Sequence, residues 1–314
     1  MDASAYQVKR IRFRAAVRVE GAGTRAQMWL RVDRRTGGNS FFDNMSARPI
    51  TSSAWAKYTI DGYVLDDSAR IYFGVMVFGP GRVWVDDVTL ETTGQVRVDA
   101  PEPARSLSDT ELANLIAFAK VFGYARHFNP SDQVAAADWE TIAVEGARLA
   151  EEAVNRQELA ERIQSIFNPI APTIRVYPEG SRPELPAELR PALRDGLRVV
   201  RWRHLGVRLG SESGMYQDTR EWATLRDGQM PSGWIDPAEP FDAAIGSGLR
   251  VLVPLTLYAE DYGTRPWGAL PSSDDLYIRS ATNRSTRLAA LIVAWNAIQH
   301  FYPYFDVTKL DWHA

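Results

Sequence analysis

Apolar and polar residues alternate through the first hundred residues of the chain. In residues 10–15 and 17–19, apolar side chains alternate with arginines, which is the period of a strand with one buried face. The same alternation returns, between glycine-rich turns, in residues 28–32, 58–64, 71–78 and 83–90. Short strands at this spacing predict an antiparallel β-sandwich over residues 1–95.

The pattern becomes helical after a proline-rich linker over residues 96–108. Ser108 and Glu111 have the spacing of a capping box, and apolar residues follow them at helical intervals. Two further stretches of helical period come next, and Asn155 is placed to cap the second of them. We therefore expect a helical segment over residues 109–171.

The period returns to two from residue 172, where proline- and glycine-rich loops separate the expected strands. These strands are residues 173–177, 197–202, 204–209 and 249–257. They predict a β-rich segment over residues 172–280. A helical pattern resumes in residues 283–300, and we expect residues 281–314 to begin a second helical segment that this chain cuts short. The predicted fold class is therefore α+β, with more than one domain.

A duplicated sequence links the two helical regions. Residues 111–139 align without a gap to residues 284–312, at a constant offset of 284 − 111 = 173. Identical positions include the pairs His127/His300, Asp138/Asp311 and Trp139/Trp312. The shared pattern predicts a helix that ends near a proline. A second helix should follow, with the aspartate as its cap and the tryptophan packed in its first turn.

Composition narrows the range of functions. The chain holds 36 Lys and Arg against 39 Asp and Glu, a formal charge of −3, which argues against a general affinity for nucleic acid. It has no cysteine, which excludes disulfides, thiolate metal sites and a cysteine nucleophile. The longest apolar runs are much shorter than the roughly 20 residues of a membrane span. Residues 1–20 do not have the pattern of a signal peptide.

No motif in the sequence supports catalysis. In residues 210–214, a glutamate occupies the centre of a glycine-flanked motif where a serine hydrolase would need its serine. The histidines do not have the spacings typical of zinc ligands. His127 and His300 hold equivalent positions in the repeat, which favours a shared structural role near the end of a helix. We assign no catalytic residue and expect that this chain is not itself an enzyme.

Several segments of the chain resemble a known peptidase family. Residues 122–130 and 295–304 resemble two segments upstream of the protease domain in bacterial tail-specific, or C-terminal-processing, serine peptidases. Residues 202–207 are similar to a strand of the same region. Residues 26–91 resemble the carbohydrate-binding, galactose-binding-like jelly roll that some members carry first. The resemblance covers nearly the whole chain.

This resemblance implies the non-catalytic amino-terminal region of an exported peptidase. In that family a serine nucleophile and a lysine base lie in a later domain, which implies a catalytic dyad downstream of residue 314. The expected role is to position substrate or partners for that protease domain, in the periplasm or outside the cell. The expected partners are the protease domain of the same polypeptide, a peptide substrate or a glycan. The alternative is a carbohydrate-binding or protein-docking sandwich module.

The jelly roll supplies the candidate binding residues. Trp29 and Trp84 alternate with apolar neighbours, so each is expected on an outer sheet face, where an aromatic ring can stack on a sugar. Asp43 and Asn44 are the candidate polar contacts to such a ligand. Asp87 is the candidate ligand of a structural calcium ion, and we expect no other cofactor. The alternatives are tryptophans that pack against a neighbouring domain and an aspartate that faces solvent or a backbone group.

Overall fold

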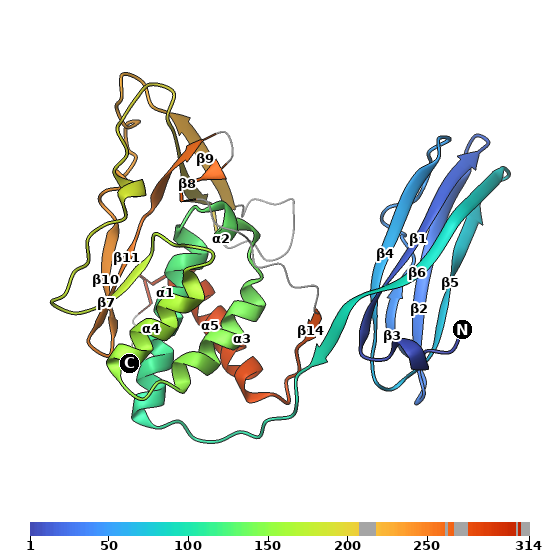
Figure 1. The fold of residues 1–314 in the computed structure, drawn as a ribbon, viewed down its shortest axis with the longest axis horizontal. Helices are drawn as coiled ribbons and strands as arrows, with labels where there is room; N and C mark the ends of the chain where they lie inside the picture. The colour runs from blue at the N-terminus through green and yellow to red at the C-terminus, as the bar shows by residue number, and fades with distance from the viewer. Residues whose placement is uncertain (207–217, 261–262, 267–275, 306, 309–314) are drawn as a thin grey trace. The chain divides into compact units, whose positions relative to one another are not determined.

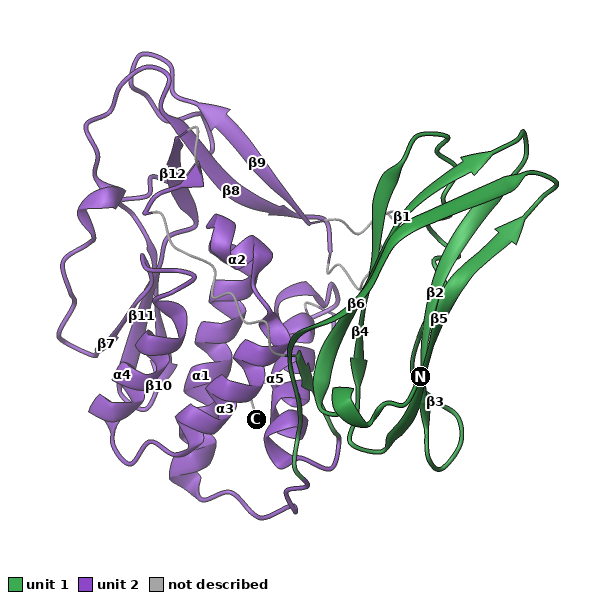
Figure 2. Ribbon diagram, turned by 45° about the vertical axis from the view of Figure 1, so that its right-hand side comes forward, with its two compact units in different colours: residues 1–100, 272–280 green, residues 101–271, 281–314 purple. Residues whose placement is uncertain are grey.

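The computed structural model describes residues 1–206, 218–260, 263–266, 276–305 and 307–308. The chain divides into two compact units (Figure 2). Unit 1 comprises residues 1–100 and 272–280, and unit 2 comprises residues 101–271 and 281–314. The α+β class predicted from the sequence is confirmed, because unit 1 is built of β-strands and unit 2 combines helices with two sheets.

Unit 1 consists of two β-sheets (Figure 1). After a 3-10 helix at Ser4–Tyr6, its strands are β1 (Lys9–Glu20), β2 (Arg25–Arg34), β3 (Asn39–Asp43), β4 (Ala56–Val64), β5 (Ser68–Phe78), β6 (Arg82–Val98) and β14 (Leu276–Ile278). One sheet has the order β14-β6-β1-β4 and the other has the order β3-β2-β5. The β14–β6 pair is parallel, and the remaining pairs are antiparallel.

Alternation along β1 and β2 builds the core of unit 1. Every second residue of β1 from Ile11 to Val19 is buried, and these side chains share one apolar cluster with those of β2, β4 and β5. The residues between them face outward, and Arg12 pairs there with Asp61 across the sheet at 2.7 Å. Two sheets therefore pack over one core, as a sandwich requires. The jelly-roll topology that the sequence suggested is not confirmed.

Unit 2 contains the helices and two further sheets. Its helices are α1 (Asp109–Phe128), α2 (Asp132–Ala136), α3 (Trp139–Glu151), α4 (Arg156–Phe167) and α5 (Arg284–Phe301), with a 3-10 helix at Ala187–Leu189. Its strands are β7 (Arg175–Pro178), β8 (Arg198–His204), β9 (Asp218–Thr224), β10 (Phe241–Gly246), β11 (Leu249–Val253), β12 (Thr256–Glu260) and β13 (Gly263–Thr264). The sheet orders are β10-β11-β7 and β13-β12-β8-β9. None of the helices in the described part of the chain combines the length and the apolar character that crossing a membrane requires.

The helix starts predicted from local signals are confirmed. Ser108 caps α1 in a capping box, in which the backbone N–H of Ser108 also donates to the Glu111 carboxylate at 2.7 Å. Asp138 caps α3, and Asn155 caps α4. Trp139 packs edge-on against a phenylalanine of α1, with ring centroids 5.2 Å apart. The first copy of the repeat therefore has the predicted structure, whereas the Asp311 and Trp312 of the second copy lie outside the described residues.

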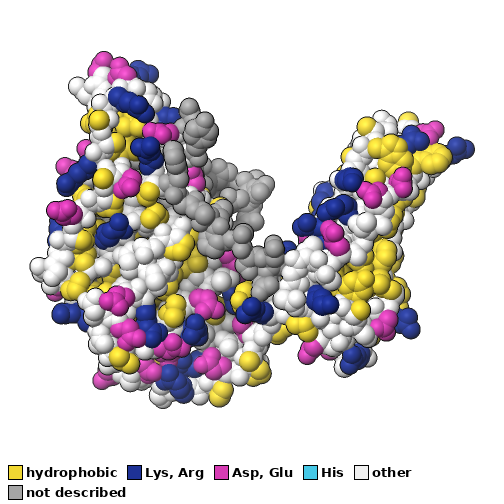
Figure 3. Space-filling model, in the orientation of Figure 1, with side chains coloured by type: hydrophobic (Ala, Val, Ile, Leu, Met, Phe, Trp, Pro, Cys, Tyr) yellow, Lys and Arg dark blue, Asp and Glu magenta, His cyan; other side chains and the backbone are white. Residues whose placement is uncertain are grey.

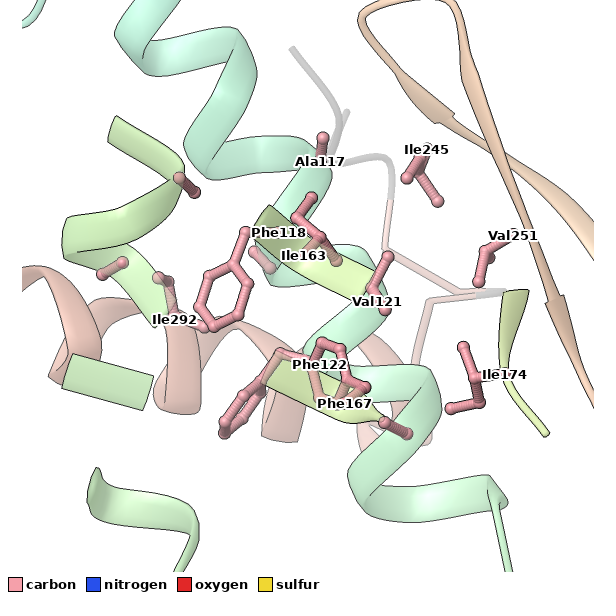
Figure 4. Packing of buried hydrophobic residues seen from close by; sticks show 14 of the residues in the cluster. Ala117, Phe118, Val121, Phe122, Ile163, Phe167, Ile174, Ile245, Val251 and Ile292 are labelled. Carbon is pink, nitrogen blue, oxygen red and sulfur yellow. The ribbon is translucent and has the colours of Figure 1, made fainter. Parts of the chain in front are cut away.

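Helix α1 lies at the centre of the core of unit 2. Figure 4 shows Phe118 of α1 close to Phe167 of α4, and the centroids of these two rings are 6.2 Å apart. Ile292 of α5 and Val251 of β11 belong to the same buried cluster. The core thus joins segments from both ends of the unit to the sheet β10-β11-β7.

A buried ion pair fastens α5 to α3. Arg284 Nη1 lies 2.6 Å from Glu151 Oε2, and the two side chains are only 6% and 7% exposed. Arg105, in the segment before α1, donates to the other oxygen of the Glu151 carboxylate at 2.6 Å. One carboxylate therefore holds three segments of unit 2 together.

Three predicted strand assignments differ from the structure. Residues 249–257 form β11 and β12 in two different sheets, because Pro254 lacks the N–H that a continuous ladder needs. His204 ends strand β8 instead of starting a separate strand, and most of the predicted strand 204–209 lies outside the described residues. Residues 276–278, placed by their pattern in the second β-rich segment, pair with β6 in unit 1.

Candidate functional site

Two side chains of β8 bind the carboxyl end of α1. His204 donates from Nε2 to the backbone carbonyl of His127, and Trp202 Nε1 donates to the carbonyl of Asn129 at 2.9 Å. Because Trp202 and His204 alternate on one strand, they face the same side, and their rings stack with centroids 5.9 Å apart. The other ring nitrogen of His204 lies 2.7 Å from the Asp218 carboxylate on β9. These bonds satisfy carbonyls that a helix end leaves without intrahelical partners.

An arginine of β9 completes this attachment. Arg220 Nη2 donates to the carbonyl of Pro130 at 2.8 Å, and its Nη1 lies 2.6 Å from the Asp132 carboxylate. The same carboxylate accepts the backbone N–H of Thr264 at 2.7 Å. The end of α1 and the start of α2 are therefore fixed to the sheet β13-β12-β8-β9 by several side chains.

Three histidines gather at this junction. The His127 ring lies 5.9 Å from that of His300 and 6.4 Å from that of His204, measured between centroids. Phe128 and Phe301 pack edge-on among them, with Phe128 5.0 Å from His300 and Phe301 4.9 Å from His127. Because His127 and His300 are in the last turns of α1 and α5, the structural position predicted for them near helix ends is confirmed.

Burial keeps two of these histidines neutral. Loss of solvation, together with the charges of Arg126 and the neighbouring histidines, lowers the pKa of His127 to about 3. Loss of solvation also lowers the pKa of His300 to about 4, with a further contribution from His204. At neutral pH the rings of His127 and His300 are therefore uncharged.

The neutral histidines should make unit 2 less stable in mild acid. The unfolded chain takes up protons near the ordinary histidine pKa of 6.5, whereas the folded chain does not until pH falls to about 4 for His300 and about 3 for His127. Stability should therefore fall as pH decreases from 6.5 toward 4, with each histidine adding a slope of up to about 1.4 kcal/mol per pH unit. Urea unfolding between pH 7 and pH 5 measures this slope. His300→Gln should reduce it, and an unchanged slope in that variant would contradict the assignment.

Two adjacent cavities open beside the cluster. The first, of about 220 Å³, is lined by aromatic and aliphatic side chains together with one ring of the cluster: Tyr124, Phe128, Phe241, Val253, Leu255 and His300. The second, of about 530 Å³, shares Phe128 and Leu255 with the first and adds Trp202, Thr256 and charged side chains. A dry apolar cavity of about 150 Å³ suffices for one benzene ring in another protein, so the first cavity has room for an aromatic group.

The charged wall of the second cavity is a three-residue network. The Glu221 carboxylate pairs with Arg201 at 3.0 Å and with Arg203 at 3.1 Å. Hydrogen bonding to Arg201, and then to Arg203, lowers the pKa of Glu221, so the carboxylate stays ionised. Two guanidinium groups against one carboxylate leave a net charge of +1 on this wall. The residues that line the two cavities include no serine, cysteine or lysine.

Polar atoms without partners lie next to the first cavity. Asn296 of α5 donates to the carbonyls of Ala119 and Ile292, both at 2.9 Å, while its Oδ1 and the Nε2 of His300 are buried without a partner. Both atoms lie against Gly123, where a Cβ would be 1.8 Å from the first and 2.8 Å from the second. Buried polar atoms are normally paired, so these two atoms could each form a further hydrogen bond. Among the described residues, no three His, Cys, Asp or Glu side chains are arranged to hold a metal ion.

The structure separates the two tryptophans predicted to bind a ligand. Trp84 lies on β6, is 42% exposed, and donates from Nε1 to Glu20 at 3.1 Å. The Arg18 guanidinium covers its ring at 5.1 Å. Trp29 lies on β2 in the other sheet, half-buried against Gly74 of β5. The two rings therefore belong to different sheets and do not form one platform, and ligand binding at each stays a prediction.

The predicted polar and metal-binding residues of unit 1 already have protein partners. The Asp43 carboxylate accepts the N–H of Met45 and pairs with Arg48, and Asn44 Oδ1 accepts the N–H of Ser46 at 3.1 Å. The Asp87 carboxylate lies 2.8 Å from Lys57 Nζ. Calcium at Asp87 stays a prediction, and it would have to displace that lysine. The rejected motif at residues 210–214 lies outside the described residues.

The histidine and aromatic site was not predicted from the sequence. Two signals for it were present: His127 and His300 occupy equivalent repeat positions, and Trp202 and His204 alternate on one strand. Neither signal shows that β8 meets the end of α1, because His204 and His127 are 77 positions apart.

Comparison with known proteins gives one significant relative in sequence. No protein-family profile matches the chain. Over 106 residues it is 40% identical to YbfP, an uncharacterised HTH-type transcriptional regulator of Bacillus subtilis strain 168. The match covers 33% of this chain and 34% of the regulator, so the similarity spans about a third of that relative's length.

A solved structure with which the chain was compared shows a weak similarity. The CBM22-1 and GH10 modules of endo-1,4-beta-D-xylanase 10B from Clostridium thermocellum, complexed with xylohexaose, are 14% identical to the chain. The alignment covers 53% of this chain and 34% of that one, with a TM-score of 0.25. A score this low carries no argument about fold or ligand.

The regulator similarity overturns the expected membership of the tail-specific serine peptidases. The expected role as an accessory region of a protease is therefore also wrong, and so is the expected part in proteolysis. The motifs that suggested the peptidases have a general structural explanation. Asn129 and Pro130 follow the end of α1, and Asp138 caps α3, an arrangement that any helical fold can use.

Proposed function

We propose that unit 2 is a ligand-binding module for a small aromatic anion and that it serves in the regulation of transcription. The observation that carries the ligand proposal is the pair of adjoining cavities that share Phe128. Their walls are mainly aromatic and aliphatic, with a few polar groups, which is the usual composition of a small-molecule site. An aromatic ring fits the first cavity beside the uncharged His300, and an acidic group attached to it reaches the net positive wall of Arg201, Glu221 and Arg203.

The regulatory part of the proposal rests on the similarity to the HTH-type regulator. Helices α3 and α4 are joined by the four residues 152–155, a connection as short as that of a helix-turn-helix. Two of their three arginines are already paired, however: Arg148 with Glu145 and Glu152, and Arg162 with Glu152 and Glu158. On the face of unit 2 in Figure 3, basic side chains are likewise interspersed with acidic ones. These charges support a ligand-sensing role for unit 2 better than a DNA-reading role.

The ligand proposal is tested by thermal unfolding of the full chain with benzoate, benzyl alcohol and benzylamine. A ligand that binds only the folded state raises the unfolding midpoint, and at 100 times its dissociation constant it adds about 2.7 kcal/mol. We expect benzoate to raise the midpoint most and benzylamine least, because the wall of the second cavity is positive.

Three variants separate binding from folding. Phe128→Ala should abolish the benzoate shift, whereas Phe42→Ala, which removes an exposed phenylalanine of unit 1, should leave it unchanged. Arg203→Gln removes an exposed side chain, so it should fold normally, weaken benzoate binding and spare benzyl alcohol binding. Equal shifts by benzoate in the wild-type chain and in Phe128→Ala would refute the proposed site.

A further inference from the structure

An open apolar groove runs between α1 and α5, away from the ligand cavities. It has a volume of about 550 Å³. Its walls include Leu112 and Ile116 of α1 and Leu291 and Trp295 of α5. Three of these side chains are well exposed: Leu112 by 48%, Ile116 by 45% and Leu291 by 66%. An exposed apolar surface of this kind marks an interaction site.

The two helices that form the groove are the two copies of the sequence repeat, and they pack on one another at equivalent positions. Gly123 of α1 touches Asn296 of α5, and 296 − 123 is the repeat offset of 173. One turn further along, the equivalent His127 and His300 lie 5.9 Å apart. Because successive equivalent positions meet, α1 and α5 run in the same direction and are related by an approximate two-fold axis. The surface on one side of this helix pair should therefore have an equivalent surface on the opposite side of the pair.

One of the two counterpart surfaces is occupied by α3. Phe118 of α1 lies so close to Gly146 of α3 that a Cβ there would be 2.1 Å from the phenylalanine ring. Phe122 of α1 meets the first-turn Trp139 of α3 edge-on. The positions equivalent to Phe118 and Phe122 on α5 are Leu291 and Trp295, which line the open groove. The groove thus repeats, on α5, the surface that α1 presents to α3.

The α1 wall of the groove is likewise equivalent to a surface that packs against α3. Helix α3 also packs against α5, whose buried face carries Ser285, Ala289 and Ile292. The positions equivalent to these on α1 are Leu112, Ile116 and Ala119, and all three line the groove. The groove therefore has an α1 wall and an α5 wall at positions equivalent to those that α3 packs against. No described helix covers these two walls.

The charge beside the groove indicates the character of its partner. Lys120 lines the groove and forms no ion pair with any described residue. In the occupied site Glu151 of α3 pairs with Arg284, whereas the position equivalent to Arg284 on α1 is Glu111, which already pairs with Arg105. The charge that a partner helix meets inside the groove is therefore that of Lys120, and an acidic side chain placed beside it suits the groove better than a basic one.

We propose that the α1–α5 groove is the docking site of an amphipathic helix with the chemistry of α3. Such a helix has a tryptophan in its first turn, a stripe of small residues that lets it approach closely, and acidic residues beside the stripe. In α3 the stripe consists of Ala143, Gly146, Ala147 and Ala150, all buried. This inference does not depend on the proposed ligand, whose cavities are lined by other residues.

The test uses a single cysteine in the full chain, which has none of its own. Leu291→Cys places a thiol in the groove, and its rate of reaction with a thiol reagent reports whether the groove is open. The probe is a synthetic peptide with the sequence of residues 137–152. At about nine times its dissociation constant, the peptide should slow labelling about tenfold, because only one chain in ten is then free.

Three controls make the result decisive. The thiol of Val154→Cys, at a position that is 79% exposed and outside the groove, should react at the same rate with and without the peptide. A peptide with leucine in place of Gly146 and Ala147 should not protect the thiol, because it cannot approach closely. Lys120→Glu in the chain should weaken protection. Equal labelling of the Leu291→Cys thiol with and without the α3 peptide, or equal protection at both thiols, would overturn the proposal.

Discussion

Glu151→Ala should destabilise unit 2 by about 3–5 kcal/mol, the usual effect of removing one partner of a buried ion pair. The Arg284 guanidinium is 6% exposed and pairs with Glu151, and its Nη2 already has no partner. Without the carboxylate, a positive charge would stay buried with nothing to offset its lost solvation. Arg105 would lose its bond to the same carboxylate, so the segment before α1 would also come loose from α3. Urea unfolding followed by circular dichroism measures the change in free energy of unfolding.

The adjacent glutamate provides a matched control. Glu152 is 49% exposed and pairs with Arg148 and Arg162 at the surface, so Glu152→Ala should cost less than about 1 kcal/mol. Replacing both Glu151 and Arg284 with methionine should restore most of the stability, because no unpaired charge then remains. If Glu151→Ala costs no more than Glu152→Ala, the buried pair does not hold α3 to α5.

Gly123→Ala should destabilise the contact between α1 and α5 by about 1–3 kcal/mol. A Cβ at this position would lie 1.8 Å from Asn296 Oδ1 and 2.8 Å from His300 Nε2, so the two helices would have to move apart. Alanine is a better helix former than glycine by about 1 kcal/mol, and the expected loss is what remains after that gain. The midpoint of urea unfolding gives the change directly.

A second substitution tests whether the clash is the cause. In a chain that carries Asn296→Ala, the atom nearest to the new methyl group is gone. Gly123→Ala should then cost much less than it does in the wild-type chain, and the difference is the coupling energy of the two positions. An equal cost in both backgrounds would mean that α1 and α5 do not meet at these residues.

The parts of the fold that sequence could predict depend on neighbours in the chain. Ser108 and Glu111 are three residues apart, so their capping box is readable without knowing the rest of the fold. Strands β1, β2, β4, β5 and β6 of unit 1 follow in the same way from alternation, as in β1, whereas β3 and the place of β14 do not. The break at Pro254 was also present in the sequence, as a residue without an N–H inside an apolar run. It was missed because that run has the period of a single buried strand.

The candidate site could not be predicted because its parts come from distant segments. Trp202 binds a carbonyl 73 positions away, and Arg220 binds one 90 positions away. No local pattern states which helix end a strand will meet. The resemblance to the peptidases failed for a related reason, since a helix end followed by a capped helix specifies local geometry and no particular chemistry.

The attachment of α1 to β8 and β9 also bears on the order in which unit 2 folds. A helix can form within about a microsecond, but a contact between residues 73–90 positions apart must first close a long loop of chain. The carboxyl end of α1 therefore gains its bonds from Trp202 and Arg220 only after the sheet has assembled. Phe128, which both cavities share, lies at that end. We therefore expect the proposed ligand pocket to form late in folding, so that a chain with its helices formed but the sheet not yet assembled would not bind the ligand.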